Sequence, residues 1–104
     1  MNLPRCSVAC YGEVHQTYSS IKRLWKEKFE SQVTKRESKY VLSRMNKLQT
    51  SFQNEKYLEA ISITRTLFGY FSRIANSKVT PLRTCALAVA CRFWSLEGIL
   101  ERKL

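Results

Sequence analysis

Residues 12–33 have the sequence GEVHQTYSSIKRLWKEKFESQV, which carries the clearest structural signal in the chain. Apolar side chains recur in it at intervals of three or four residues, namely Val14, Tyr18, Ile21, Trp25, Phe29 and Val33. This spacing places them on one face of an α-helix, because a helix turns once in about 3.6 residues. The stretch therefore predicts an amphipathic helix over about 12–33 with one face in a core.

The residues after this helix predict a break and a second helix. Thr34 and Glu37 fit a capping box, in which the hydroxyl and the carboxylate bind backbone N–H groups at a helix start. The second helix then carries an apolar face of Val41, Met45, Leu48 and Phe52. Asn54 is the expected N-cap of the next helix, because a short polar side chain can accept a hydrogen bond from the first turn.

A third helix is predicted over about 55–75, and a fourth over about 81–102. The apolar face of the third consists of Tyr57, Ala60, Ile61, Leu67, Phe68, Phe71 and Ile74. Ile63 and Tyr70 are expected to point away from that face. Thr80 and Pro81 mark the fourth start, since Thr can cap and Pro fits the first helical position.

The composition bounds the fold. With 104 residues, three Gly and two Pro, and few segments with strand-like alternation, the chain is expected to form one all-α domain over 1–104. Residues 1–11 are expected as an irregular lead-in. Four helices joined by short connections indicate a compact antiparallel bundle, although the sequence leaves the packing order open.

The fourth helix is apolar on two sides. Its main stripe consists of Leu82, Cys85, Ala86, Val89, Phe93, Leu96 and Leu100. Leu87, Cys91 and Trp94 form a second stripe, and these three residues are the candidate protein interface. The helix is thus either the most central element or one that offers its second stripe to a partner, and Trp94 is either a core residue or an anchor.

The charge is strongly positive and unevenly placed. Eighteen Lys or Arg face eight acidic residues, all Glu, which gives a formal charge of +10. Such an excess costs self-repulsion unless an anion offsets it. The stretch 22–47 holds much of it, and the outward face of the second helix combines Arg36, Lys39 and Lys47 with Ser43, Asn46 and Thr50.

These cations predict contacts with nucleic-acid phosphates that are sensitive to salt and indifferent to base sequence. The candidate binding residues are Lys22, Arg23, Lys26, Arg36, Lys39, Lys47, Arg65 and Arg73. Tyr40 is a candidate platform for an unpaired base. The alternative is a solvated face that only keeps the protein in solution.

Catalytic and metal chemistry find little support in the sequence. The chain has no Asp and a single histidine, His15, so the usual acid–base arrangements cannot be assembled, and no enzyme, metal or cofactor is expected. Cys6, Cys10, Cys85 and Cys91 lack zinc-site spacing and are expected to be reduced thiols. Cys85 and Cys91 are interpreted as small apolar residues of the core.

The N-terminal residues lack the apolar segment of a signal peptide, and no apolar run is long enough to span a bilayer. We therefore expect a soluble, cytoplasmic protein without a membrane partner or a small-molecule substrate.

A basic, non-catalytic helical bundle of this size, with its cations in 22–47 and a spare apolar stripe at Leu87, Cys91 and Trp94, resembles the small subunit of type I (Cascade) CRISPR effector complexes. The resemblance is one of class, not of motif. It implies a role in antiviral defence as one of several copies in a ribonucleoprotein complex with guide RNA. The basic face would then contact the backbone of the target or displaced DNA strand, and the stripe would contact neighbouring subunits. In that family the small subunit can arise from an internal start within the large-subunit gene, with which residues 1–11 are compatible.

Two other interpretations stay open at this point. A helical protein-interaction adaptor or structural component would use the second stripe of the fourth helix and would bind no nucleic acid. A ribosome-associated or other RNA-binding subunit would share the electrostatics, and phosphate contacts alone do not separate RNA from DNA.

Overall fold

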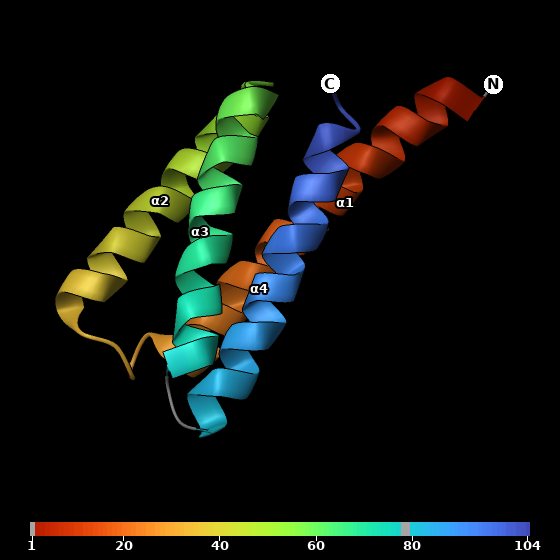
Figure 1. The fold of residues 1–104 in the computed structure, drawn as a ribbon. Helices are drawn as coiled ribbons and strands as arrows, with labels where there is room; N and C mark the ends of the chain where they lie inside the picture. The colour runs from red at the N-terminus through yellow and green to blue at the C-terminus, as the bar shows by residue number, and fades with distance from the viewer. Residues whose placement is uncertain (1, 78–79) are drawn as a thin grey trace.

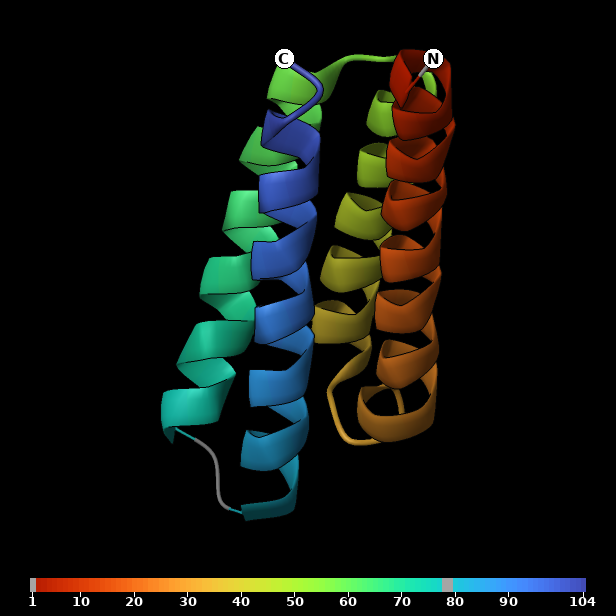
Figure 2. The same ribbon diagram turned by 90° about the vertical axis from the view of Figure 1, so that its right-hand side faces the viewer.

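The chain forms four long helices that run alternately up and down, as the ribbon shows from two sides (Figures 1 and 2). This computed structural model describes the backbone of residues 2–77 and 80–104 and the side chains of 12–77 and 82–104. The helices are α1 (Asn2–Leu24), continued by a short π-helix η1 (Trp25–Phe29), then α2 (Lys35–Gln53), α3 (Tyr57–Ser77) and α4 (Thr80–Glu101). The predicted all-α bundle is confirmed.

The first helix differs from the prediction at both ends. Its backbone is already helical at Asn2, so the expectation of an irregular lead-in over 1–11 is wrong for residues 2–11. At its other end the α-helix gives way to a π-helical turn, in which the Glu30 N–H donates to the Trp25 carbonyl at 3.0 Å. Residues four apart drift about 40° round a regular α-helix. The wider π turn offsets this drift and keeps both Trp25 and Phe29 buried.

The start of α2 is the predicted capping box. The Glu37 N–H donates to Thr34 Oγ1 at 3.1 Å, and the Thr34 N–H donates to Glu37 Oε1 at 3.2 Å. These two bonds satisfy donors that the first turn of a helix otherwise leaves without partners. They fix the point at which the chain reverses direction after η1.

The turn between α2 and α3 corrects the role of Asn54, which is the C-cap of α2 and not the N-cap of α3. The Lys56 N–H donates to the Ser51 carbonyl at 2.8 Å, and the Glu55 N–H donates to the Phe52 carbonyl at 3.2 Å. This is the Schellman pattern of a helix end. It holds Glu55 at a φ of 60°, in the left-handed region that glycine usually occupies.

The core is continuous along the bundle and contains the predicted faces of all four helices. It includes a group of aromatic rings in which Phe71 of α3 packs edge-on against Trp25 and Phe29 and is stacked with Phe93. Phe68 is half-buried at the edge of this core. The fully buried side chains with the largest volume are Trp25, Tyr18, Phe29, Phe71 and Phe93.

The prediction that Ile63 and Tyr70 point away from the core is wrong. Ile63 is buried, and the half-buried Tyr70 packs edge-on against Phe71. The reason is that α3 packs against α4 on one side and against α2 on the other, so it buries a wider face than its main stripe. Figure 2 shows α4 between α3 and α1, diagonally across the bundle from α2.

Specific polar contacts hold the helices in register. The buried Tyr18 hydroxyl of α1 donates to the Met45 carbonyl of α2 at 2.9 Å, and burial raises the pKa of Tyr18 to about 12. On the other side of α1, Arg92 of α4 donates to Ser20 Oγ at 2.9 Å. Among the described residues, no helix combines the length and apolar character needed to cross a membrane.

Candidate nucleic-acid interface

The antiparallel topology gathers basic side chains at one end of the bundle. At this end η1 follows α1, α2 begins, α3 ends and α4 begins (Figure 1). We call it the basic end. We define it by the exposed Lys and Arg side chains that the structure describes there, which are Lys22, Arg23, Lys26, Lys28, Lys35, Arg36, Lys39, Arg73 and Arg83. Nine cations here face Glu27, Glu30 and Glu37, which leaves a local excess of nine minus three, or +6.

The cations that α1 and η1 add to the basic end lie on the outward side of the helix. Lys22 and Lys26 are one turn apart, and together with Arg23 and Ser19 they line a shallow surface hollow. The helix pattern explains this placement, because each of these positions lies between the buried residues Tyr18, Ile21, Trp25 and Phe29.

The α2 contribution has two parts. Lys35 and Lys39 line a second hollow together with Glu30 and Leu42, on the side of α2 next to the end of η1. Arg36 is exposed on the outer side of the same turns. Lys47 is also exposed, but it lies about three turns further along α2 and outside the basic end.

Tyr40, the candidate stacking residue, is only partly available. Its side chain is 37% exposed, and its ring lies 5.7 Å from that of Tyr70 while the Arg44 guanidinium lies 5.5 Å from its centroid. The Tyr70 hydroxyl donates to Glu37 Oε2 at 3.4 Å. Burial, and then the charge of Glu37, raise the pKa of Tyr70 to about 12. A base could cover only the exposed part of the Tyr40 ring.

Arg65, which the sequence analysis grouped with the phosphate-binding residues, is engaged elsewhere. Its Nε donates to Glu97 Oε2 at 2.8 Å, and its Nη2 lies 3.6 Å from Glu101 Oε2. The hydrogen bond to Glu97 is the main cause that raises the pKa of Arg65. Two carboxylates already neutralise this guanidinium, so we remove Arg65 from the candidate site, whereas Arg73 stays at the basic end.

Toward the opposite end, the described charged side chains are balanced, with five cations and five glutamates, namely Lys47, Lys56, Arg65, Arg102 and Lys103 against Glu13, Glu55, Glu59, Glu97 and Glu101. Ion pairs between described side chains join Arg65 to Glu97 and Glu101, and Arg102 to Glu13. None of these pairs involves a cation of the basic end. The basic end therefore holds +6 of the formal charge of +10, at one pole of an elongated body of 49 × 22 × 19 Å.

Lys28, Lys35 and Arg83 were not among the predicted binding residues, although Lys28 and Lys35 lie in the basic stretch 22–47. Arg83 lies 10 residues after Arg73 and 44 residues after Lys39, so it falls outside that stretch. The predicted up-and-down topology could have added Arg83, because it brings alternate helix ends to one pole.

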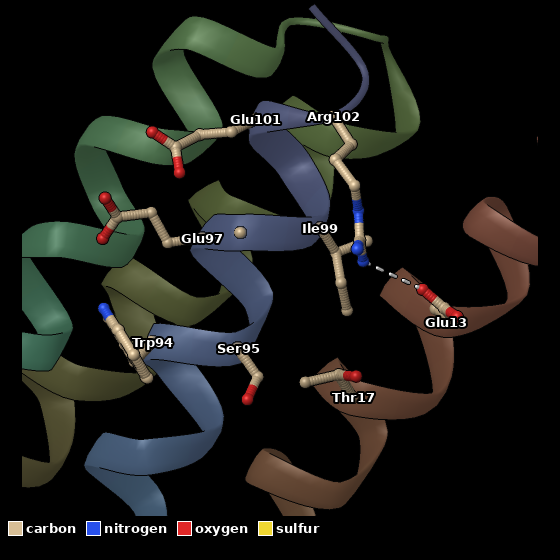
Figure 3. A pocket seen from close by; sticks show the side chains of 9 residues that line it. Glu13, Thr17, Trp94, Ser95, Glu97, Ile99, Glu101 and Arg102 are labelled. Carbon is tan, nitrogen blue, oxygen red and sulfur yellow. Dashed lines mark hydrogen bonds and ion pairs between the residues drawn. The ribbon is translucent and has the colours of Figure 1, made fainter.

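A second surface lies on α4, where the stripe of Leu87, Cys91 and Trp94 is exposed to solvent. The interpretation of Cys91 as a core residue is therefore wrong, while Cys85 is half-buried against the core. Figure 3 shows Trp94 pointing toward α3 beside a hollow of about 580 Å³, with Ser95 and Thr17 on the α1 side. The stripe is exposed because α1 and α3 already cover the other faces of α4.

His15 is exposed on α1. Within the residues that the structure describes, no group of three or more His, Cys or Glu side chains could hold a metal ion.

Comparisons with protein-family models, with curated proteins and with solved structures found no match to this chain.

Proposed function

We propose that this protein is a non-catalytic nucleic-acid-binding subunit that holds the phosphate backbone with its basic end. The observation that carries the proposal is the gathering of nine exposed described cations from all four helices around three glutamates, at one pole of the bundle. Cations that served hydration alone would not need to be concentrated, whereas a polyanion favours a continuous positive surface.

The chemistry of these side chains supports backbone binding over base recognition. Lys and Arg on helix surfaces neutralise phosphates and release counterions. A recognition helix reads bases by entering the major groove with side chains that reach base edges. Here the cations come from several helix ends and are spread over about 20 Å of bundle width, an arrangement that suits contacts along a backbone.

A narrower form of the proposal is a subunit of a type I CRISPR effector complex, as the class resemblance implies. In that case the basic end would track the target or displaced DNA strand, and base pairing with guide RNA would supply the sequence specificity. Genes for effector proteins beside the gene for this chain would support this form. A ribosomal gene neighbourhood would favour the RNA-binding form instead.

The exposed α4 stripe favours a second candidate function, a protein-interaction adaptor. Trp94 is 69% exposed and Leu87 is 49% exposed, and with the exposed Cys91 they form a contiguous apolar stripe, the kind of surface that marks protein–protein contacts. This candidate predicts that the chain is not retained on nucleic acid at low salt.

A lysine footprint tests the proposal. The chain is mixed with mixed-sequence single- and double-stranded DNA and RNA, lysines are acetylated, and protection is measured by mass spectrometry. We expect protection of Lys22, Lys26 and Lys39, similar for different base sequences, while Lys56 and Lys103 at the other end serve as internal controls. Equal reactivity of both groups with and without nucleic acid would refute the proposal.

A further inference from the structure

Oppositely charged residues of α4 lie at the two ends of its apolar stripe, and at the second end Arg65 and Arg102 are also present, each in an ion pair. Toward the start of the helix lies the exposed cation Arg83, and toward its end lie Glu97 and Glu101. The Glu101 side chain is 51% exposed, and its contact with Arg65 is long, at 3.6 Å. Glu101 can therefore accept a further cation from outside the chain.

A surface with this order of groups is complementary to its own reversed copy. If a second chain lies antiparallel on the stripe, Leu87 of each copy faces Trp94 of the partner subunit, because the two residues are equally far from the centre of the stripe. The same reversal brings Arg83 within about one helical turn of Glu101 of the partner subunit. Cys91 lies near the centre of the stripe and so near its own counterpart.

The distribution of charge over the whole molecule favours the same orientation. A parallel pair would bring the two basic ends together, and each carries a local excess of nine minus three, or +6. An antiparallel pair separates them along α4, whose 22 residues extend over about 33 Å, several times the Debye length at physiological ionic strength. Electrostatic repulsion between the two basic ends thus disfavours the parallel pair and is largely screened in the antiparallel pair.

We propose that the outward face of α4 is a self-association surface, on which a second copy of this chain docks antiparallel about a two-fold axis near Cys91. Such an interface is isologous and closes at two subunits. Trp94 is its anchor, because a large aromatic side chain at the centre of an interface contributes most to affinity. Since α2 lies diagonally across the bundle from α4, the Arg36 side of the basic end stays free in the pair.

The first test measures mass by sedimentation equilibrium with the full chain under reducing conditions and without nucleic acid. The outcome is thus independent of the proposed nucleic-acid binding. We expect a monomer–dimer equilibrium that Leu87→Glu and Trp94→Glu each weaken at least tenfold. Leu58→Glu is the matched control, because Leu58 is 72% exposed on α3, outside the stripe, and should leave the equilibrium unchanged. A chain that is monomeric up to millimolar concentration would overturn the proposal.

A charge exchange tests the antiparallel orientation. Arg83→Glu and Glu101→Arg should each weaken the dimer several-fold, because each places like charges opposite one another across the axis. The double variant should restore it. Assemblies larger than two, or a double variant no better than the single ones, would overturn the antiparallel pair.

The exposed thiol of Cys91 gives a direct test of the axis. In a chain that keeps Cys91 and carries Cys6→Ser, Cys10→Ser and Cys85→Ala, mild oxidation should give a covalent dimer on a non-reducing gel. The control places its only thiol on α2 by Ser43→Cys with all native cysteines replaced, and should stay monomeric. Equal cross-linking of both chains would count against the proposal. A second outcome would also count against the proposal, namely a monomeric chain in which Trp94→Glu abolishes oligonucleotide binding. Trp94 would then be a platform for bases and not a contact between two copies.

Discussion

At the residue scale, Glu55 is the position with the clearest conformational cost. Its φ of 60° lies in the left-handed region, which costs a residue with a Cβ atom about 1–2 kcal/mol. Glycine adopts this conformation freely and is the usual residue at this place in a Schellman motif. The turn between α2 and α3 is therefore formed at some expense of stability.

We predict that Glu55→Gly stabilises the protein by about 0.5–1 kcal/mol, the relief of strain being partly offset by the larger chain entropy of glycine. Urea unfolding monitored by circular dichroism measures the change. Glu55→Ala removes the same carboxylate but keeps the Cβ atom, so it should bring no such gain. An equal gain from alanine would mean that charge, and not backbone conformation, limits stability at this turn.

A second residue-scale prediction concerns Tyr18. Its pKa is about 12 in the folded protein and about 10 in an unfolded chain, so the folded state holds the proton more tightly. Stability from this group is complete below pH 10 and falls between pH 10 and 12, by at most about 1.4 kcal/mol per pH unit. Unfolding free energies measured at pH 9 and pH 11 should show this loss.

Tyr18→Phe separates this effect from the hydrogen bond. The variant loses the bond to the Met45 carbonyl, which should cost about 1 kcal/mol at neutral pH. It should also lose less stability than the natural chain between pH 9 and pH 11, although Tyr70 still contributes. The same alkaline loss in both proteins would show that Tyr18 ionises no differently in the folded state.

At the scale of elements, the start of α2 depends on one reciprocal cap. Thr34→Ala should cost about 1 kcal/mol, because the Glu37 N–H loses its acceptor, while Thr34→Ser should retain most of the stability. Thermal unfolding of the three proteins checks the order. If serine were as damaging as alanine, the methyl group and not the hydroxyl would be the stabilising part.

The sequence predicted the elements well where the signal was local. The capping box at Thr34 and the apolar spacing of α1, α2 and α4 depend on neighbours within one or two turns, so they could be predicted without tertiary information. Ile63 could not, because its burial depends on α3 packing against two helices at once. The roles of Asn54 and Glu55 were missed because a polar residue between two helices can end one or begin the next.

At the scale of the whole molecule, the arrangement of charge was only half visible in the sequence. The cations of 22–39 form a local cluster that a linear window finds, whereas Arg73 and Arg83 join it only through the antiparallel topology. Arg65 is exposed on α3, as Arg73 is, but two carboxylates of α4 neutralise its charge. The second stripe of α4 was recognised from its spacing, but only the packing showed that all three of its residues are exposed.

The salt dependence of nucleic-acid binding tests the central claim, that the basic end binds phosphates. Each lost phosphate contact lowers the slope of log K against log salt concentration by about 0.9 on double-stranded DNA and about 0.7 on a single strand. Lys26→Ala/Arg36→Ala/Lys39→Ala should therefore reduce the slope by about 2–3. The control Lys56→Ala/Arg102→Ala/Lys103→Ala removes the same charge from the other end and should leave the slope unchanged. Equal slopes for the two triple variants would contradict the claim.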